Sequence, residues 1–128
     1  MPSGKEWNDR LAAGTVKFFL ERIGSHDRVT SVTQESQNVF AVERDGMTPI
    51  RAWVCDVYVV GIADYAHMIE QEPDIDCIVT MSGYNSWSPE AKNQGYEDEV
   101  GVFKFGEFMG ALNYEGHDFV QYEPPSRF

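Results

Sequence analysis

The side chains best suited to binding chemistry lie in one loop, where Tyr84, Asn85 and Trp87 follow a predicted buried strand over Asp76–Ser82. In open α/β sheets, ligands bind beyond the carboxyl ends of the strands. Two aromatic rings and an amide there could stack on a base, another ring or a peptide. The three residues are therefore a candidate binding loop. For Trp87 we favour the alternative that it packs as a hydrophobic staple on the following helix, and Tyr84 and Asn85 stay open.

Other residue types that support catalysis are not arranged for it. His26, His67 and His117 have no metal-ligand spacing, and we expect them to be surface or cap residues. Asp74 and Asp76 could bind a metal, but acids before a buried strand commonly mark its solvated edge. The sequence contains no glycine-rich phosphate loop, nucleophile elbow or Cys-His pair. We therefore expect no metal and no cofactor.

Charge is distributed unevenly along the chain. The 128 residues include 10 Lys and Arg against 21 Asp and Glu, a net charge of −11. From Met1 to Arg51 the two signs cancel, whereas Ala52–Ala91 contains acids and no Lys or Arg. We expect this stretch to form an acidic face. Its candidate residues are Asp64, Glu70, Glu72 and Asp74.

An acidic surface repels phosphates, because affinity for DNA depends on Lys and Arg that displace counterions. Nucleic-acid binding is not expected through the acidic part, and any such contact would use the N-terminal part. The basic residues of that part are Arg10, Lys17, Arg22, Arg28, Arg44 and Arg51. The acidic face suits a protein partner with a basic surface. The plainer alternative is that acidity only keeps the protein in solution.

Both cysteines lie inside apolar runs, which predicts buried, reduced thiols for Cys55 and Cys77, possible neighbours in the sheet. A small secreted domain would carry several paired cysteines. The start of the chain, MPSGKEWNDR, has no apolar segment of the kind found in signal peptides, and no apolar run could span a membrane. We expect a cytoplasmic protein without a membrane partner.

Hydrophobic periodicity predicts the elements that position these residues. A first helix is expected from about Glu6 to Ile23, with Gly24 as its stop. The Asp45-Gly46 pair predicts a turn, and Ser88 before a proline predicts a helix start. The predicted strands are Val29–Thr33, Val39–Glu43, Ile50–Val60, Asp76–Ser82 and Val100–Phe105. The further helices are Ala63–Gln71, Ser88–Glu97 and Gly106–Asn113.

This order predicts an α/β fold with a mixed β-sheet and helices on both faces. The first three strands are expected to form an antiparallel meander, and the strand–helix–strand units after them imply parallel pairing. The strand from Ile50 is apolar on both sides, as in a central strand covered on two faces. With 42% hydrophobic residues and no internal linker, residues 1–128 are expected to form a single domain. Residues 1–5 and 120–128 are expected to be extended tails.

The α-β-β-β-α-β order resembles the core of the restriction-endonuclease-like fold, the PD-(D/E)xK superfamily. The stretch Ile78–Leu112 is similar to the C-terminal part of Mrr-like members. In those proteins a buried strand ends in a small polar turn, a capped helix and a further strand follow, and a short helix ends in leucine. The residues that fill these places here are Ser82, Ser88, Glu90-Ala91, Val100-Gly101-Val102 and Phe108 to Leu112.

The resemblance implies an acid on the second core strand and an acid-x-Lys on the third, holding a divalent metal and activating water. The matching positions are Glu43 or Asp45 and then Asp56, but Tyr58 stands where the lysine should be. An acid-x-Lys occurs instead at Glu90-Ala91-Lys92, at a helix start. The catalytic motif is degenerate.

Two functions follow from these observations. The first is a non-catalytic interaction or regulatory protein on a nuclease-like scaffold, which binds a basic partner protein through its acidic surface or its aromatic loop. The alternative is a degenerate or unusual nuclease that uses Mg²⁺ with Glu43 and Asp56. The oligomeric state stays open.

Overall fold

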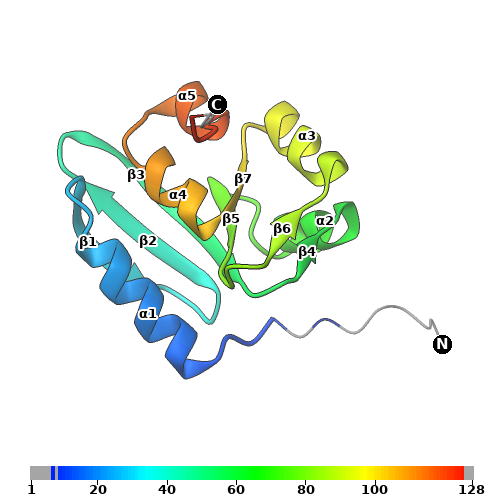
Figure 1. Cartoon of the computed structure of the whole chain (residues 1–128), viewed down its shortest axis with the longest axis horizontal. Coiled ribbons are helices and arrows are strands. Elements are labelled where there is room, and N and C mark those ends of the chain that lie inside the picture. The colour runs from blue at the N-terminus through cyan, green and yellow to red at the C-terminus, as the bar shows by residue number, and fades with distance from the viewer. Residues whose placement is uncertain (1–6, 8, 126–128) are drawn as a thin grey trace.

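A computed structural model describes Trp7 and residues 9–125 of the chain. Its centre is a five-stranded mixed sheet in the order β1-β2-β3-β5-β7 (Figure 1). The first three strands pair antiparallel, whereas β5 and β7 run parallel to β3. The strands are β1 Val29–Gln34, β2 Val39–Arg44, β3 Met47–Cys55, β5 Cys77–Thr80 and β7 Gly101–Lys104. The predicted mixed α/β fold is confirmed.

Helices cover both faces of the sheet, as predicted. On one face lie α1 (Ala13–Gly24), α4 (Phe105–Ala111) and α5 (Gly116–Val120), which share a core that includes Phe19, Phe108 and Phe119. On the other face α2 (Ile62–Gln71) and α3 (Pro89–Asp98) form the α2–α3 layer. Figure 1 shows the two groups of helices on opposite sides of the strands.

The third strand has the two-sided burial that its sequence predicts. Along β3, Ala52 and Val54 belong to the core under α1 and α4, while Trp53 and Cys55 belong to the core under α2 and α3. The strand nevertheless ends at Cys55 and does not continue to Val60. Val59–Val60 forms a separate short strand, β4, which pairs in parallel with β6 (Ser86–Trp87).

The two turn and cap predictions are confirmed. Gly46 has a positive φ of 69° in the β2–β3 turn, a conformation that costs glycine little. Ser88 caps α3, because its hydroxyl accepts a hydrogen bond from the backbone nitrogen of Ala91 at 3.2 Å. Pro89 is the first helical residue, where its missing N–H removes no intrahelical bond.

Both ends of the chain differ from the prediction. Helix α1 begins at Ala13, not at Glu6, which lies outside the described residues. Trp7 precedes the helix and stacks on His67 of α2, with ring centroids 4.1 Å apart. A further helix that the sequence did not predict, α5, lies before the expected tail of residues 120–128, and of the described residues of that tail only Val120, its first residue, is helical and buried. Among the described residues, no helix is long and apolar enough to cross a bilayer.

Candidate functional site

The site begins where β3 and its parallel neighbour β5 end side by side. Asp56 is the first residue after β3, and its Oδ1 accepts three hydrogen bonds from the loop that follows β5. The donors are the backbone nitrogen of Ser82 at 3.0 Å, the Ser82 hydroxyl at 2.6 Å and the Asn85 amide at 2.7 Å. A carboxylate oxygen holding three donors fixes this loop against the end of β3.

A second set of hydrogen bonds connects the same loop to Thr80 in β5 and to Val57 after β3. The Asn85 amide also donates to the Thr80 hydroxyl at 3.0 Å, and that hydroxyl donates to the carbonyl of Val57 at 2.7 Å. Thr80 and Asn85 are both buried, so each polar group would be costly without its partner. Asn85 is therefore a structural member of the candidate loop.

The network leaves an aromatic pair in solvent. Tyr84 lies between the two loop residues that bind Asp56, and its side chain is 76% exposed. Tyr58 is 67% exposed, and the two ring centroids are 5.9 Å apart. Of the candidate binding loop, Tyr84 is therefore the member available to a ligand. Its neighbour Tyr58 was not predicted as a binding residue and was noted only because it occupies the position of the expected catalytic lysine.

Trp87, the third member of the candidate loop, makes contacts within the fold. Its indole N–H donates to Glu107 at 2.9 Å, and the Lys92 ammonium lies 4.8 Å from its ring centroid. Lys92 belongs to α3, so Trp87 lies against the helix that follows it in the chain. The three loop residues thus have three different environments.

Lys92, the lysine of the Glu90-Ala91-Lys92 motif at the start of α3, is buried among aromatic side chains. Its ammonium donates to the carbonyl of Val102 at 2.6 Å and also lies 4.8 Å from the ring centroid of Phe103. Burial lowers the pKa of Lys92, and the nearby carboxylates of Glu107 and Glu123 offset part of this effect. Because its ammonium is buried and bound to Val102, this lysine is not placed for the role that the resemblance gives to an active-site lysine.

The two acids named for a metal site do not meet. Glu43 lies near the β2–β3 turn, since the next residue, Arg44, pairs with Met47. Asp56 follows the opposite end of β3, and the intervening strand length corresponds to about 20 Å. No single ion could contact both carboxylates. In the part of the chain that the structure describes, no three His, Cys, Asp or Glu side chains gather to hold a metal.

The expected acidic face is only partly available. Asp64 is buried and accepts a hydrogen bond from the backbone nitrogen of Gly61 at 2.9 Å. Glu72 forms an ion pair with Arg51 at 3.2 Å, and Arg51 also binds Glu35. Glu70 and Asp74 are exposed. The prediction of four solvated acids on one face is wrong for Asp64, because its carboxylate caps α2.

Further exposed acids come from α3 and the residue after it. Glu90 lies in the first turn of this helix, Glu97 and Asp98 are its last residues, and Glu99 follows it. Because α2 packs against α3, these acids and those of α2 lie on the same helical layer. Lys92 is the one Lys or Arg from Ala52 to Phe103, and it is buried.

Arg44 is a structural residue and not part of a basic contact surface. Its buried guanidinium donates to the carbonyl groups of Thr48, Leu112 and Tyr114 at 2.8, 3.0 and 2.7 Å, and to Glu115 at 2.9 Å. Desolvation lowers the pKa of Arg44, while Glu115 acts in the opposite direction. The arginine therefore ties the β2–β3 hairpin to the chain after α4.

The cysteines are free and buried, as expected. They lie on neighbouring strands, but Cys55 pairs with Thr80, and Cys77 pairs with Ala52 three residues away. Cys55 belongs to the core under α2 and Cys77 to the core under α1, so the thiols are on opposite faces of the sheet. Burial raises the pKa of Cys55 to about 11, which keeps it protonated at neutral pH.

A cluster near the start of the described chain was not anticipated. Asp9 binds His67 at 2.8 Å, and the His67 ring is sandwiched by the stacked Trp7 ring and the edge-on Trp53 ring. Asp9 and Asp56 also line one cavity of about 280 Å³. No local sequence signal reveals these contacts, because Asp9 and His67 are 58 residues apart.

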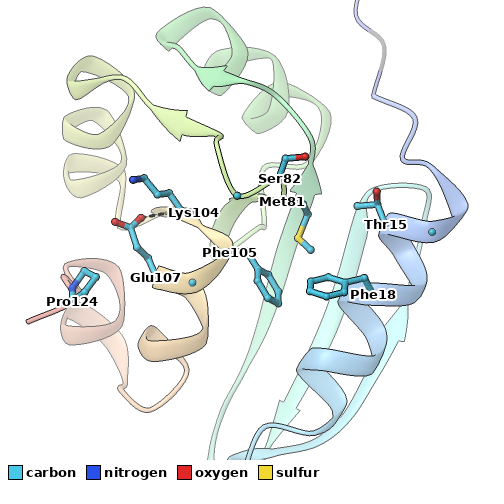
Figure 2. Close-up of a pocket in the computed structure, with 11 residues that line it drawn as sticks. Thr15, Phe18, Met81, Ser82, Lys104, Phe105, Glu107 and Pro124 are labelled. Carbon is cyan, nitrogen blue, oxygen red and sulfur yellow. Dashed lines mark hydrogen bonds between the residues drawn. The ribbon is translucent and has the colours of Figure 1, made fainter.

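A larger cavity of about 850 Å³ lies at the carboxyl ends of β5 and β7 (Figure 2). The rings of Phe18 from α1 and Phe105 from α4 point toward one another across it, with centroids 5.5 Å apart. Lys104 and Glu107 lie together on one side, and the backbone N–H of Lys104 donates to the Glu107 carboxylate at 2.9 Å. The cavity could admit an apolar group, but its two opposite charges select neither an anion nor a cation.

Comparisons with protein-family models, with curated proteins and with solved structures give no match to this chain. The function is therefore inferred from the site itself.

Proposed function

We propose that this protein is a non-catalytic interaction or regulatory protein that binds a basic partner protein through the α2–α3 layer. The observation that carries the proposal is the burial of Lys92, the only Lys or Arg from Ala52 to Phe103. With that lysine inside, the exposed Lys and Arg of the chain lie outside this stretch.

The charge that remains on the layer is negative over a wide area. The exposed acids of the stretch are Asp56, Glu70, Asp74, Glu90, Glu97, Asp98 and Glu99. Such a surface accelerates the encounter with a positive partner and disfavours partners rich in phosphate. The opposite face differs, because Lys17 and Arg22 of α1 are exposed beside Glu21.

We further propose that the scaffold is related to restriction-endonuclease-like domains and has lost their chemistry. The element order and the similarity of Ile78–Leu112 support the relationship. The aromatic side chain at Tyr58 and the separation of Glu43 from Asp56 support the loss. A regulator of a DNA-handling protein is the role that best suits an acidic surface on such a scaffold, because basic grooves that hold DNA also attract carboxylates.

The test compares two variants with equal net charge. In the first, Glu70→Gln, Asp74→Asn and Glu97→Gln neutralise exposed acids of the α2–α3 layer. In the control, Glu21→Gln, Asp27→Asn and Asp45→Asn neutralise exposed acids outside that layer. Partners that co-purify from the native host are identified by mass spectrometry. The affinity of each purified partner is then measured over a salt series.

The proposal predicts a basic partner whose affinity falls as salt rises, because a Debye length of about 10 Å at 0.1 M screens exposed charges. The layer variant should bind more weakly and with a shallower salt dependence, whereas the control variant should bind like the natural chain. Equal loss in both variants, or an affinity independent of salt, would contradict the proposal.

A further inference from the structure

An apolar patch interrupts the acidic surface at one place. Exposed large hydrophobic side chains cluster just before and in β4, at the start of α2 and in the loop after β5. We call this cluster the tyrosine patch. Its members are Tyr58, Val59, Ile62 and Tyr84. The two tyrosines are the most exposed of the large hydrophobic residues that the structure describes. Exposed apolar side chains that lie together in this way are typical of a contact surface.

The patch is held in place from two directions. The β4–β6 pairing connects its two segments, with Ser86 donating its backbone N–H to the carbonyl of Tyr58 at 2.8 Å. From the other direction, Asp56 binds Ser82 and Asn85, the residues on either side of the Gly83-Tyr84 tip. Binding by a rigid aromatic pair costs little conformational entropy, which favours a preformed recognition element.

Asp56 also brings a second carboxylate oxygen to the edge of the patch. Its three hydrogen bonds all go to Oδ1, and Oδ2 accepts none from the described residues. Asp56 is exposed and lies two residues before Tyr58. A carboxylate oxygen and two exposed rings therefore lie close together in the chain beside the exposed acids of the α2–α3 layer, while Arg10 lines a cavity on another side of Asp56.

We propose that the tyrosine patch with Asp56 is a receptor for an arginine side chain of the basic partner, an inference that rests on the proposed function. A guanidinium is planar and weakly hydrated, so it stacks on aromatic faces while its N–H groups bind a carboxylate. Lysine suits the patch less well, because its ammonium is a strongly hydrated point charge. The surrounding acids attract the cation and repel the phosphates of a nucleic acid that could otherwise stack on the rings.

The experiment uses short probes in place of the unidentified partner. The probes are a capped peptide of alternating glycine and arginine, the same peptide with lysine, and a single-stranded oligonucleotide. Binding to the full chain is measured by calorimetry and by NMR shifts of the tyrosine ring protons. The variants are Tyr84→Ala, Tyr58→Ala and Asp56→Asn, the last of which keeps the Oδ1 acceptor. Tyr114→Ala is the matched control, because Tyr114 is exposed and packs on Tyr122 with centroids 5.5 Å apart.

The arginine peptide should bind more tightly than the lysine peptide and should shift the ring signals of Tyr58 and Tyr84. Each tyrosine-to-alanine change in the patch should weaken arginine binding about two- to fivefold, as expected for an exposed cation–π contact. Asp56→Asn should reduce the preference for arginine over lysine. Tyr114→Ala should leave both affinities unchanged.

Three results would overturn the inference. Equal, salt-sensitive binding of both peptides that ignores Tyr84→Ala would remove the arginine receptor and leave the acidic-surface function intact. Tight binding of the oligonucleotide at the patch would contradict both proposals. Failure of the arginine peptide to bind or to shift the ring signals would also refute the receptor, while the partner experiment above still decides the proposed function.

Discussion

At the scale of single residues, a few polar side chains that make several contacts each shape this protein. Asp56 organises a loop by accepting three hydrogen bonds on one oxygen. Lys92, by contrast, destabilises the folded state unless its contacts offset the desolvation, because its charged ammonium is held among aromatic rings. Because this lysine is buried, the exposed charged residues of α2 and α3 are all acidic, so the energetic cost of its burial bears on the proposed function.

Replacement of Lys92 by methionine should therefore raise the free energy of unfolding by about 1 kcal/mol at pH 7, as is common when a buried ion gives way to an apolar side chain. The pKa of Lys92 is lower in the folded than in the unfolded chain, where the ordinary value is 10.5. The cost is full below the folded pKa and disappears as the pH rises toward 10.5.

The measurement is urea unfolding of both proteins at several pH values from neutral to about 10. The advantage of Lys92→Met should shrink as the pH rises. A constant advantage would indicate that packing and not charge explains it. A large loss of stability would indicate that the hydrogen bond to Val102 outweighs desolvation.

At the scale of elements, the close packing of α3 on β7 depends on one glycine. A methyl group added to Gly95 would collide with the carbonyl oxygen of Val100 and press on the side chain of Val102. We expect Gly95→Ala to lower the free energy of unfolding by about 1–3 kcal/mol, the usual cost of overpacking. At Gly14 of α1, where no described atom lies within 4 Å of the added methyl, alanine should instead add about 0.5 kcal/mol.

Thermal or urea unfolding of the two glycine variants tests whether the free energy of unfolding falls in one and rises in the other. Gly95→Ala and Gly14→Ala both reduce the freedom of the unfolded chain in the same way, so the difference between them isolates the steric contact. Equal effects at the two positions would show that α3 can move away from β7 without cost.

Most elements could be predicted from local pattern alone. The alternation along β3, the turn at Asp45-Gly46 and the Ser88 cap depend on neighbours in sequence, and all three are confirmed. The end of β3 could not be predicted, because the apolar run continues to Val60. The strand ends just before Asp56, whose carboxylate accepts hydrogen bonds from loop residues 26 and 29 positions away.

The site was less predictable than the fold for the same reason. Tyr84 was identified from its place after a buried strand, yet its partner Tyr58 comes from a different segment. The prediction of an acidic face was wrong for Asp64, because composition does not distinguish a solvated carboxylate from one that caps a helix. Likewise, the burial of Lys92 depends on Trp87 and Phe103, which only the fold brings together.

At the scale of the whole molecule, charge and chemistry lead to one further expectation. The protein should not hydrolyse DNA or RNA in the presence of Mg²⁺ or Mn²⁺. Glu43 and Asp56 lie at opposite ends of β3, and an acidic layer disfavours the approach of phosphates. Incubation with labelled duplex and single-stranded substrates, followed by gel analysis, tests this. Reproducible cleavage that disappears in Asp56→Ala would show that the molecule is a nuclease.

The buried guanidinium of Arg44 has a consequence for the order in which the molecule can assemble. The arginine belongs to the second strand, but three of its four partners belong to Leu112, Tyr114 and Glu115. During synthesis from the N-terminus, the β2–β3 hairpin leaves the ribosome about seventy residues before those acceptors. Until they arrive, Arg44 cannot be buried without an unsatisfied charge. The sheet therefore reaches its final packing late, and a nascent chain stalled before Leu112 should keep this side of the hairpin open to solvent and to chaperones.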